Sequence, residues 1–161
     1  GPCYLRLGRV GEPRLHDERV AFQLGRAIEI RAGGWLTIIA TGSMLATALA
    51  VAERLARDGV DTRVLSMHTV KPLDTEAVLA AARETRAIVT LEEHSVIGGL
   101  GSAVAEALAE SGVGPVVFKR LGLPASFASE AGSREHLLAV HGLSEDGIMR
   151  TLKPILDLIT S

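Results

Sequence analysis

Glu92, Glu93 and His94 place two carboxylates and an imidazole directly after an apolar run. Such side chains serve as general bases and as metal ligands. Neighbouring residues of a strand point to opposite faces, so at most Glu92 and His94 converge, provided that the strand extends that far. Two ligands do not close a metal site, and we therefore expect no metal to be bound here.

A glycine cluster follows these residues. Gly98, Gly99 and Gly101 open a helical segment, where backbone N–H groups and the helix dipole can receive an anion. The dinucleotide fingerprint G-x-G-x-x-G fails, because Val104 stands where its last glycine is needed. The competing explanation is that small residues let a helix pack tightly on a sheet. We define the candidate loop, for an anion or for an interface, as Glu93, His94, Gly98, Gly99 and Gly101.

Residues suited to nucleophilic catalysis lack the motifs that would activate them. The hydrolase elbow G-x-S-x-G is absent, since residues 41–45 read TGSML. Cys3 has no obvious base beside it. His68 ends another apolar run and could approach residues 92–94, although a solvated or internally satisfied histidine is the commoner case. We expect Ser43 and Cys3 to be structural.

Two arginines, Arg6 and Arg9, stand near the end of the first strand-like segment. A guanidinium group can bind a phosphate through two parallel hydrogen bonds. The alternative is a solvated strand end, which is the usual place for arginine. Composition alone favours that alternative.

The elements that must position these residues follow a β-α rhythm. After a strand over residues 3–9 and an irregular charged linker over 10–21, apolar runs predict strands over 35–40, 62–67, 87–91 and 115–121. Apolar residues at helical spacing predict helices over 44–58, 74–85, 101–110 and 134–140, and a last helix capped by Ser144.

This alternation predicts the fold class. Strands separated by helices of roughly 10–15 residues form right-handed crossovers and a parallel sheet. We expect an α/β fold, doubly wound, with a mostly parallel sheet and helices on both faces. Ligands of such folds bind beyond the carboxyl ends of the strands, which selects the loops at 41–43, 68–69, 92–101 and 122–123.

Composition excludes several classes of protein. The chain has 161 residues, 17 Lys and Arg, and 19 Asp and Glu, giving a formal net charge of −2, so it lacks the cationic surplus that nucleic acid binding requires. No apolar run approaches roughly 18 residues, so we expect no membrane span. A single cysteine suits a reducing compartment, and we expect a cytoplasmic protein. With 47% hydrophobic but only 3% aromatic residues, the core must be aliphatic.

Five segments, in order, resemble the C-terminal part of transketolase-like thiamine diphosphate enzymes. They are residues 1–9 (GPCYLRLGR), 37–43 (TIIATGS), 69–74 (TVKPLD), 92–104 (EEHSVIGGLGSAV) and 142–143 (GL). Deoxyxylulose-phosphate synthase and the beta subunits of 2-oxoacid dehydrogenases share this pattern. The tail over residues 127–144 is more similar to a transketolase subunit than to those beta subunits.

The resemblance implies a division of the chain. Residues 1–9 correspond to the last strand of a preceding pyrimidine-binding domain, residues 10–21 to a linker, and residues 22–161 to the complete C-terminal domain. In that family thiamine diphosphate and Mg²⁺ lie between a diphosphate-binding and a pyrimidine-binding domain. We therefore expect those domains as partners, catalysis only in the assembly, and no cofactor binding by this chain alone.

The same resemblance implies a function. The complete enzyme would transfer two-carbon ketol units between sugar phosphates, with this domain organising a homodimer and Arg6 and Arg9 placed to meet the phosphate of the substrate. A deoxyxylulose-phosphate synthase or a 2-oxoacid dehydrogenase beta subunit is the alternative within the superfamily. A stand-alone regulatory module that binds a small anion is the alternative outside it.

Overall fold

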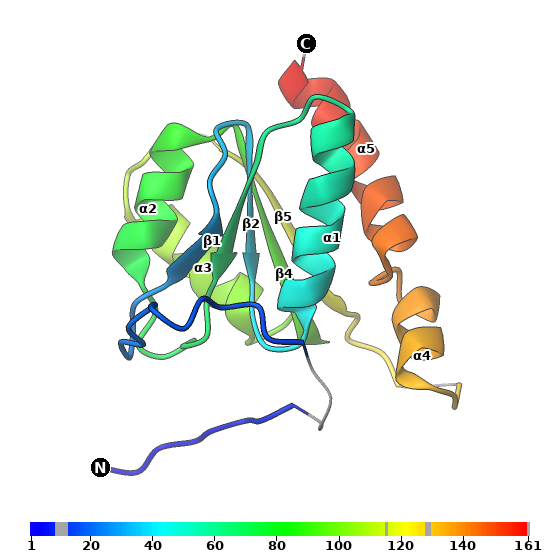
Figure 1. Cartoon of the computed structure of the whole chain (residues 1–161), viewed down its shortest axis with the longest axis horizontal. Coiled ribbons are helices and arrows are strands. Elements are labelled where there is room, and N and C mark those ends of the chain that lie inside the picture. The colour runs from blue at the N-terminus through cyan, green and yellow to red at the C-terminus, as the bar shows by residue number, and fades with distance from the viewer. Residues whose placement is uncertain (9–12, 115, 128–129, 161) are drawn as a thin grey trace.

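A five-stranded sheet in the order β1-β3-β2-β4-β5 forms the centre of the computed structural model, which describes residues 1–8, 13–114, 116–127 and 130–160 (Figure 1). The strands are β1 (Ile28–Arg31), β2 (Leu36–Ala40), β3 (Thr62–Ser66), β4 (Ala87–Ser95) and β5 (Val117–Leu123). Strands β2 to β5 run parallel, and β1 pairs antiparallel with β3 at one edge.

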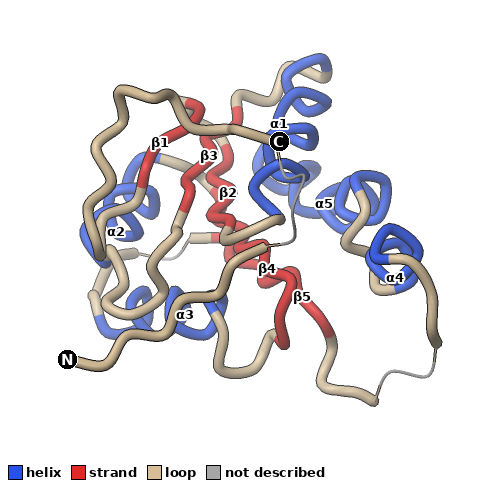
Figure 2. Tube along the Cα trace, turned by 60° about the horizontal axis from the view of Figure 1, so that its bottom comes forward, coloured by secondary structure: helices blue, strands red, loops and turns tan. Residues whose placement is uncertain are grey.

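Helices cover both faces of this sheet. They are α1 (Met44–Arg57), α2 (Thr75–Glu84), α3 (Leu100–Glu110), α4 (Arg134–Val140) and α5 (Glu145–Thr160). Helices α1 and α5 lie on one face and α2 and α3 on the other, while α4 lies beyond α5 at the side (Figures 1 and 2). The predicted doubly wound α/β fold is confirmed.

Alternation along the buried strands divides the apolar residues between two cores. Ile38 packs in the core under α1 and α5, and its neighbour Ile39 packs in the core under α2 and α3. Both side chains are at most 1% exposed. Complete burial of one such side chain contributes about 1.5–3 kcal/mol, so these strands account for much of the stability.

Side-chain caps define where two of the helices begin. The carboxylate of Asp74 accepts a hydrogen bond from the backbone N–H of Ala77 (3.1 Å), as the sequence predicts, and also from that of Ala27 (2.7 Å). The hydroxyl of Ser144 accepts one from the backbone N–H of Gly147 (3.3 Å). Asp74 therefore joins α2 to the segment that leads into β1.

The strand predicted over residues 3–9 does not form among the described residues of this chain alone, and its assignment to the sheet of a preceding domain stays a prediction. Residues 1–8 form neither strand nor helix and are all exposed, and Arg9 lies outside the described residues. The five-stranded sheet includes no partner for this segment. A strand exists only where a neighbour satisfies its N–H and C=O groups, and here they face water.

Other boundaries differ from the sequence-based expectation by a few residues. Strand β1 has no predicted counterpart, β4 extends four residues further than expected, to Ser95, and β5 begins at Val117 and ends at Leu123. The extension of β4 matters for function, because it places residues 92–94 on a strand and not in a loop.

Candidate functional site

The carboxyl ends of β2 and β4 form the topological switch point of the sheet. The chain leaves β2 through α1 towards β3 on one side, whereas β4 lies on the other side of β2. The backbone N–H of Thr41 donates to the carbonyl oxygen of Leu91 (3.2 Å), which holds the two ends together. Open α/β sheets bind their ligands at such a point.

A polar cluster of Ser43, Glu93 and Arg134 lies at this point. The guanidinium group of Arg134 binds both carboxylate oxygens of Glu93, with Nη2 2.6 Å from Oε2 and Nε 3.1 Å from Oε1. The hydroxyl of Ser43 donates to Oε2 of Glu93 (2.7 Å) and accepts from Nη2 of Arg134 (2.9 Å). We call these three residues the switch-point cluster. They join the start of α1, the end of β4 and the start of α4.

The surroundings of Glu93 favour the ionised form of its carboxyl group. Burial raises the pKa of this carboxyl group, whereas hydrogen bonds from Arg134 and Ser43 lower it. The positive charges of Arg134 and Arg6 act in the same direction, so the pKa lies below its ordinary value. A carboxylate with a lowered pKa and these partners is a weak general base near neutral pH, and the cluster fits a structural role.

Arg6 lies beside this cluster. Its Nη1 donates to the backbone carbonyl oxygen of Glu93 (3.4 Å), and its side chain is otherwise exposed. Arg9 falls outside the described residues, so the phosphate-binding role expected for Arg6 and Arg9 stays a prediction.

Glu92 is a buried carboxylate with a structural role that the sequence pattern does not predict. Its side chain is 2% exposed and lies at the N-terminus of α3, where Oε2 accepts from the backbone N–H of Leu100 and Oε1 from that of Gly101, both at 2.8 Å. The helix dipole favours a negative charge there. Glu92 therefore takes the place at the start of α3 that an external anion would occupy.

The glycines of the candidate loop meet different structural needs, and Gly99 makes room for this carboxylate. A Cβ atom on Gly99 would lie 2.0 Å from Oε2 of Glu92, and one on Gly101 would lie 2.7 Å from Oγ1 of Thr90. Gly98 has a φ of +74°, which favours glycine, and its N–H donates to the hydroxyl of Ser102 (3.0 Å). Close packing thus accounts for Gly99 and Gly101, and the positive φ accounts for Gly98.

Glu92 and His94 do not converge. The carboxylate of Glu92 binds α3, whereas the His94 ring is exposed and its Nδ1 lies 3.1 Å from the carbonyl oxygen of Ser95. The pairing of β4 with β5 shifts register between Leu91 and Ser95, which interrupts the simple alternation of faces.

Two histidines connect residues 13–25 to the carboxyl end of β3. Nε2 of His16 lies 3.0 Å from the hydroxyl of Ser66, and the rings of Phe22 and His68 are 4.5 Å apart. Nε2 of His68 is buried without a hydrogen-bond partner among the described residues. Burial, with a smaller contribution from His16, lowers the pKa of His68.

The residues present do not fit thiamine diphosphate or its metal. In the part of the chain that the structure describes, no group of three or more His, Cys, Asp or Glu side chains could hold a metal ion. The backbone donors of Leu100 and Gly101, the groups best suited to a diphosphate, are bound to Glu92.

No described helix is long and apolar enough to cross a membrane.

Sequence reasoning found two of the three residues of the switch-point cluster. The strand-end rule selected the loops that contain Ser43 and Glu93, but Arg134 comes 41 residues after Glu93 and nothing in the sequence connects them. Glu92 has no comparable signal, because it lies eight residues before Leu100, too far for a local capping motif.

Comparison with known proteins decides the family. The sequence profile described as "Transketolase, C-terminal domain" matches residues 25–148, most of the chain. The chain belongs to the transketolase C-terminal domain family. Two solved transketolases, from Campylobacter jejuni (17% identity, TM-score 0.63, 87% of this chain and 20% of that chain) and Leishmania mexicana (18%, TM-score 0.59, 84% and 18%), share its fold.

Closer relatives of this transketolase C-terminal domain include subunits of transketolases. The 6-deoxy-6-sulfo-D-fructose transketolase subunit of Clostridium sp. (strain MSTE9) is 48% identical over 93% of this chain and 46% of its own length. The 1-deoxy-D-xylulose-5-phosphate synthase of Pelotomaculum thermopropionicum is 41% identical over 94% of this chain and 24% of its own. The chain therefore spans about half the length of the transketolase subunits that it matches.

A solved structure is similar to almost the whole chain. It is described as a split-gene transketolase in the form of an inactive tetramer of four beta subunits. It is 40% identical with a TM-score of 0.86, and the match covers 99% of this chain and 50% of that one. The transketolase C-terminal domain described here thus corresponds in sequence and in fold to half of a split-transketolase subunit.

Proposed function

We propose that this chain is the C-terminal part of a thiamine diphosphate-dependent transketolase subunit that transfers two-carbon ketol units between sugar phosphates. The observation that carries the proposal is 48% identity, over 93% of the chain, to a transketolase subunit. A second relative of this kind, an apulose-4-phosphate transketolase subunit from Actinobacillus succinogenes, is 34% identical over 92% of the chain and 48% of its own length.

In this proposal the domain organises the enzyme and does not hold the cofactor. Thiamine diphosphate and Mg²⁺ bind between a diphosphate-binding and a pyrimidine-binding domain, which are the partners of this chain. Two features support this division: the carboxylate of Glu92 takes the backbone donors at the start of α3, and the Ser43–Glu93–Arg134 contacts are internal.

Arg6 and Arg9 are the residues of this chain that we assign to the substrate. The exposed guanidinium group of Arg6 lies near the switch point, where it contacts the backbone of Glu93. In the assembled enzyme we expect Arg6→Ala or Arg9→Ala to raise KM for phosphorylated sugars with little change in kcat. Unchanged kinetics for both variants would remove the assignment.

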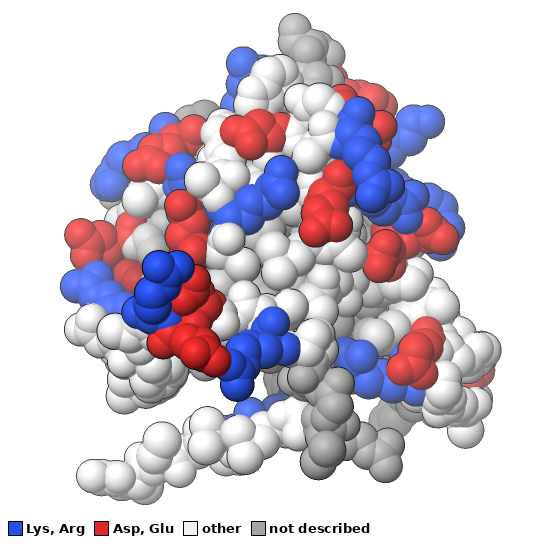
Figure 3. Space-filling model, in the orientation of Figure 1, with Lys and Arg blue, Asp and Glu red and all other residues white. Residues whose placement is uncertain are grey.

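We also propose a homodimeric assembly in the cytoplasm. The related split-gene transketolase chain forms an inactive tetramer of four beta subunits, and this supports association between copies of the present chain. Both signs of charge are interspersed on the face shown in Figure 3, which gives no support to nucleic acid or an anionic membrane as partner. The exposed thiol of Cys3 suits a reducing compartment.

Deoxyxylulose-phosphate synthase activity is the second candidate, because one such enzyme is 41% identical over 94% of the chain. Product analysis of the assembled enzyme separates the two. A ketose phosphate donor and an aldose phosphate acceptor should give a product lengthened by two carbons without release of CO₂. Condensation of pyruvate with glyceraldehyde 3-phosphate, with release of CO₂, would instead support the synthase.

A further inference from the structure

Helix α3 is an apolar helix that this fold covers only in part. Its eleven residues, LGSAVAEALAE, include only two charged side chains, Glu106 and Glu110, yet only Leu100, Gly101 and Val104 are buried. A helix that is apolar around most of its circumference is normally covered on more than one side. In this structure the sheet covers one side of α3 and α2 packs against another, which leaves Ala103, Ala105, Ala107 and Leu108 half-buried and Ala109 exposed.

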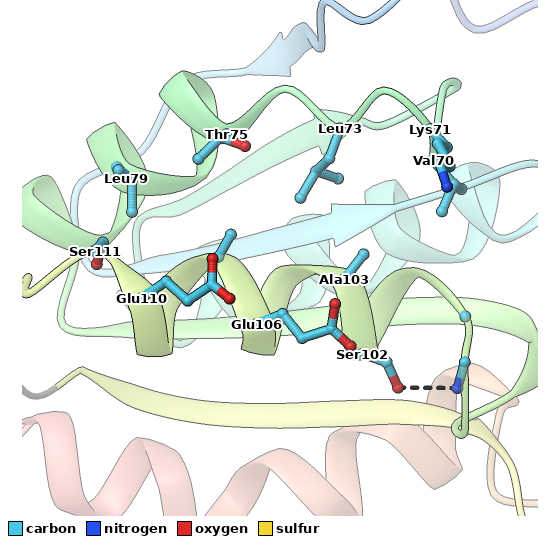
Figure 4. A pocket seen from close by; sticks show the side chains of 13 residues that line it. Val70, Lys71, Leu73, Thr75, Leu79, Ser102, Ala103, Glu106, Glu110 and Ser111 are labelled. Atoms are coloured by element: carbon cyan, nitrogen blue, oxygen red, sulfur yellow. Dashed lines mark hydrogen bonds between the residues drawn. The ribbon is translucent and has the colours of Figure 1, made fainter.

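A groove of about 580 Å³ runs between α2 and α3 (Figure 4). Leu73 and Leu79 line it from the α2 side and Ala103 and Ala107 from the α3 side, and all four are half-buried. The alanines, spaced four residues apart, lie on the same side of α3. Side chains this small let the backbone of another helix approach closely.

The charges along this groove are separated by sign. Lys71 lies at the end near the N-terminus of α3, whereas Glu106 and Glu110 follow its C-terminal half (Figure 4). All three side chains are exposed, and none of them forms a salt bridge with another of the residues that the structure describes. Helix α3 contains no cation that could neutralise its two carboxylates.

We propose that the α2–α3 groove is the surface through which two copies of this chain associate, with their α3 helices antiparallel across a two-fold axis. Such an isologous contact is self-complementary. It brings Glu106 and Glu110 of one copy to the start of α3 in the other, where Lys71 and the positive end of the helix dipole lie. A parallel arrangement would instead place the carboxylates of both copies side by side.

The choice of a second copy rests on this match of charge and shape. The groove carries a cation at one end and two carboxylates towards the other, so opposite charges pair when it meets a second copy of itself in reverse. Ala103 and Ala107 then lie near the crossing point, where helix axes that pack closely are about 8–10 Å apart. This interface rests on the homodimer proposed above and assigns its surface.

Sedimentation equilibrium of the whole chain, up to about 100 µM, tests the proposal. We expect a dimer. Lys71→Glu alone, and Glu106→Lys with Glu110→Lys, should each raise the dimer Kd by about tenfold or more, because like charges then face each other. Combining all three substitutions should restore dimerisation. Lys153→Glu on α5 and Glu53→Lys on α1 are matched controls on exposed positions and should leave the dimer unchanged.

Cross-linking gives an independent readout of the contact. In a Cys3→Ser background, Ala107→Cys should be joined to its copy by a short bis-maleimide, whereas Glu53→Cys on α1 should not. A monomeric wild-type chain, or a dimer that neither charge reversal weakens while circular dichroism shows folded variants, would overturn the proposal. Ketol transfer by the assembled enzyme is measured separately, so failure of this interface and failure of the proposed function are distinguishable.

Discussion

The buried carboxylate of Glu92 holds the start of α3 against the carboxyl end of β4. It is buried, accepts two backbone hydrogen bonds from α3, and touches the space that Gly99 leaves open. Removing such an acceptor leaves buried N–H groups unsatisfied, at a cost of about 1–3 kcal/mol. A residue whose type suits a general base or a metal ligand therefore belongs to the folding of the domain.

We predict that Glu92→Ala lowers the free energy of unfolding by about 1–3 kcal/mol, because Leu100 and Gly101 lose their acceptor. Urea unfolding followed by circular dichroism measures the change. Glu53→Ala on the exposed face of α1 is the control and should stay within about 0.5 kcal/mol of the wild type. Equal stability of Glu92→Ala and the control would contradict the capping role.

His68 predicts a dependence of stability on pH. Its pKa in the folded chain lies below the ordinary value of 6.5, so the unfolded chain takes up the proton first as the pH falls. Stability contributed by the neutral ring is present above pH 6.5 and is lost as the pH drops towards the folded pKa. Urea unfolding between about pH 7.5 and pH 5 should show a shallower loss in His68→Gln than in the wild type. Equal slopes would contradict this.

At the scale of elements, the ion pair of Glu93 and Arg134 fastens the short helix α4 to the sheet. Seven residues are too few for a helix to be stable alone, so α4 depends on such contacts. We predict faster amide hydrogen exchange in α4 for Arg134→Gln, with α2 unchanged. Arg134→Lys keeps the charge but loses the paired geometry and should be intermediate. Unchanged exchange in α4 would show that other contacts hold it.

The β-α rhythm could be predicted because each parallel strand is a buried apolar run followed by a helical pattern. Two differences between the predicted and the observed strands have the same cause, which is pairing with a neighbouring strand. Residues 3–8 alternate like a strand but have no partner in this sheet, whereas β1, with only four residues, is a strand because β3 satisfies it. The local sequence pattern contains no information on which strands pair. For the same reason it does not predict the ion pair between Arg134 and Glu93, which are far apart in the sequence.

At the scale of the whole molecule, the domain has a core on each face of its sheet, and its described residues include no group of three or more His, Cys, Asp or Glu side chains that could hold a metal ion. We predict no saturable binding of thiamine diphosphate, with or without Mg²⁺, by the chain alone. Isothermal titration calorimetry measures this. Saturable binding at micromolar affinity would contradict the division of labour proposed here.

The most direct test of the proposed function is a titration of this chain into its partner domains. The diphosphate- and pyrimidine-binding domains are held fixed with thiamine diphosphate and Mg²⁺, and two-carbon transfer between sugar phosphates is followed. We predict no turnover by either component alone, and activity that rises with added chain to a plateau at equimolar amounts. Full activity without this chain, or turnover by this chain alone, would contradict the proposal.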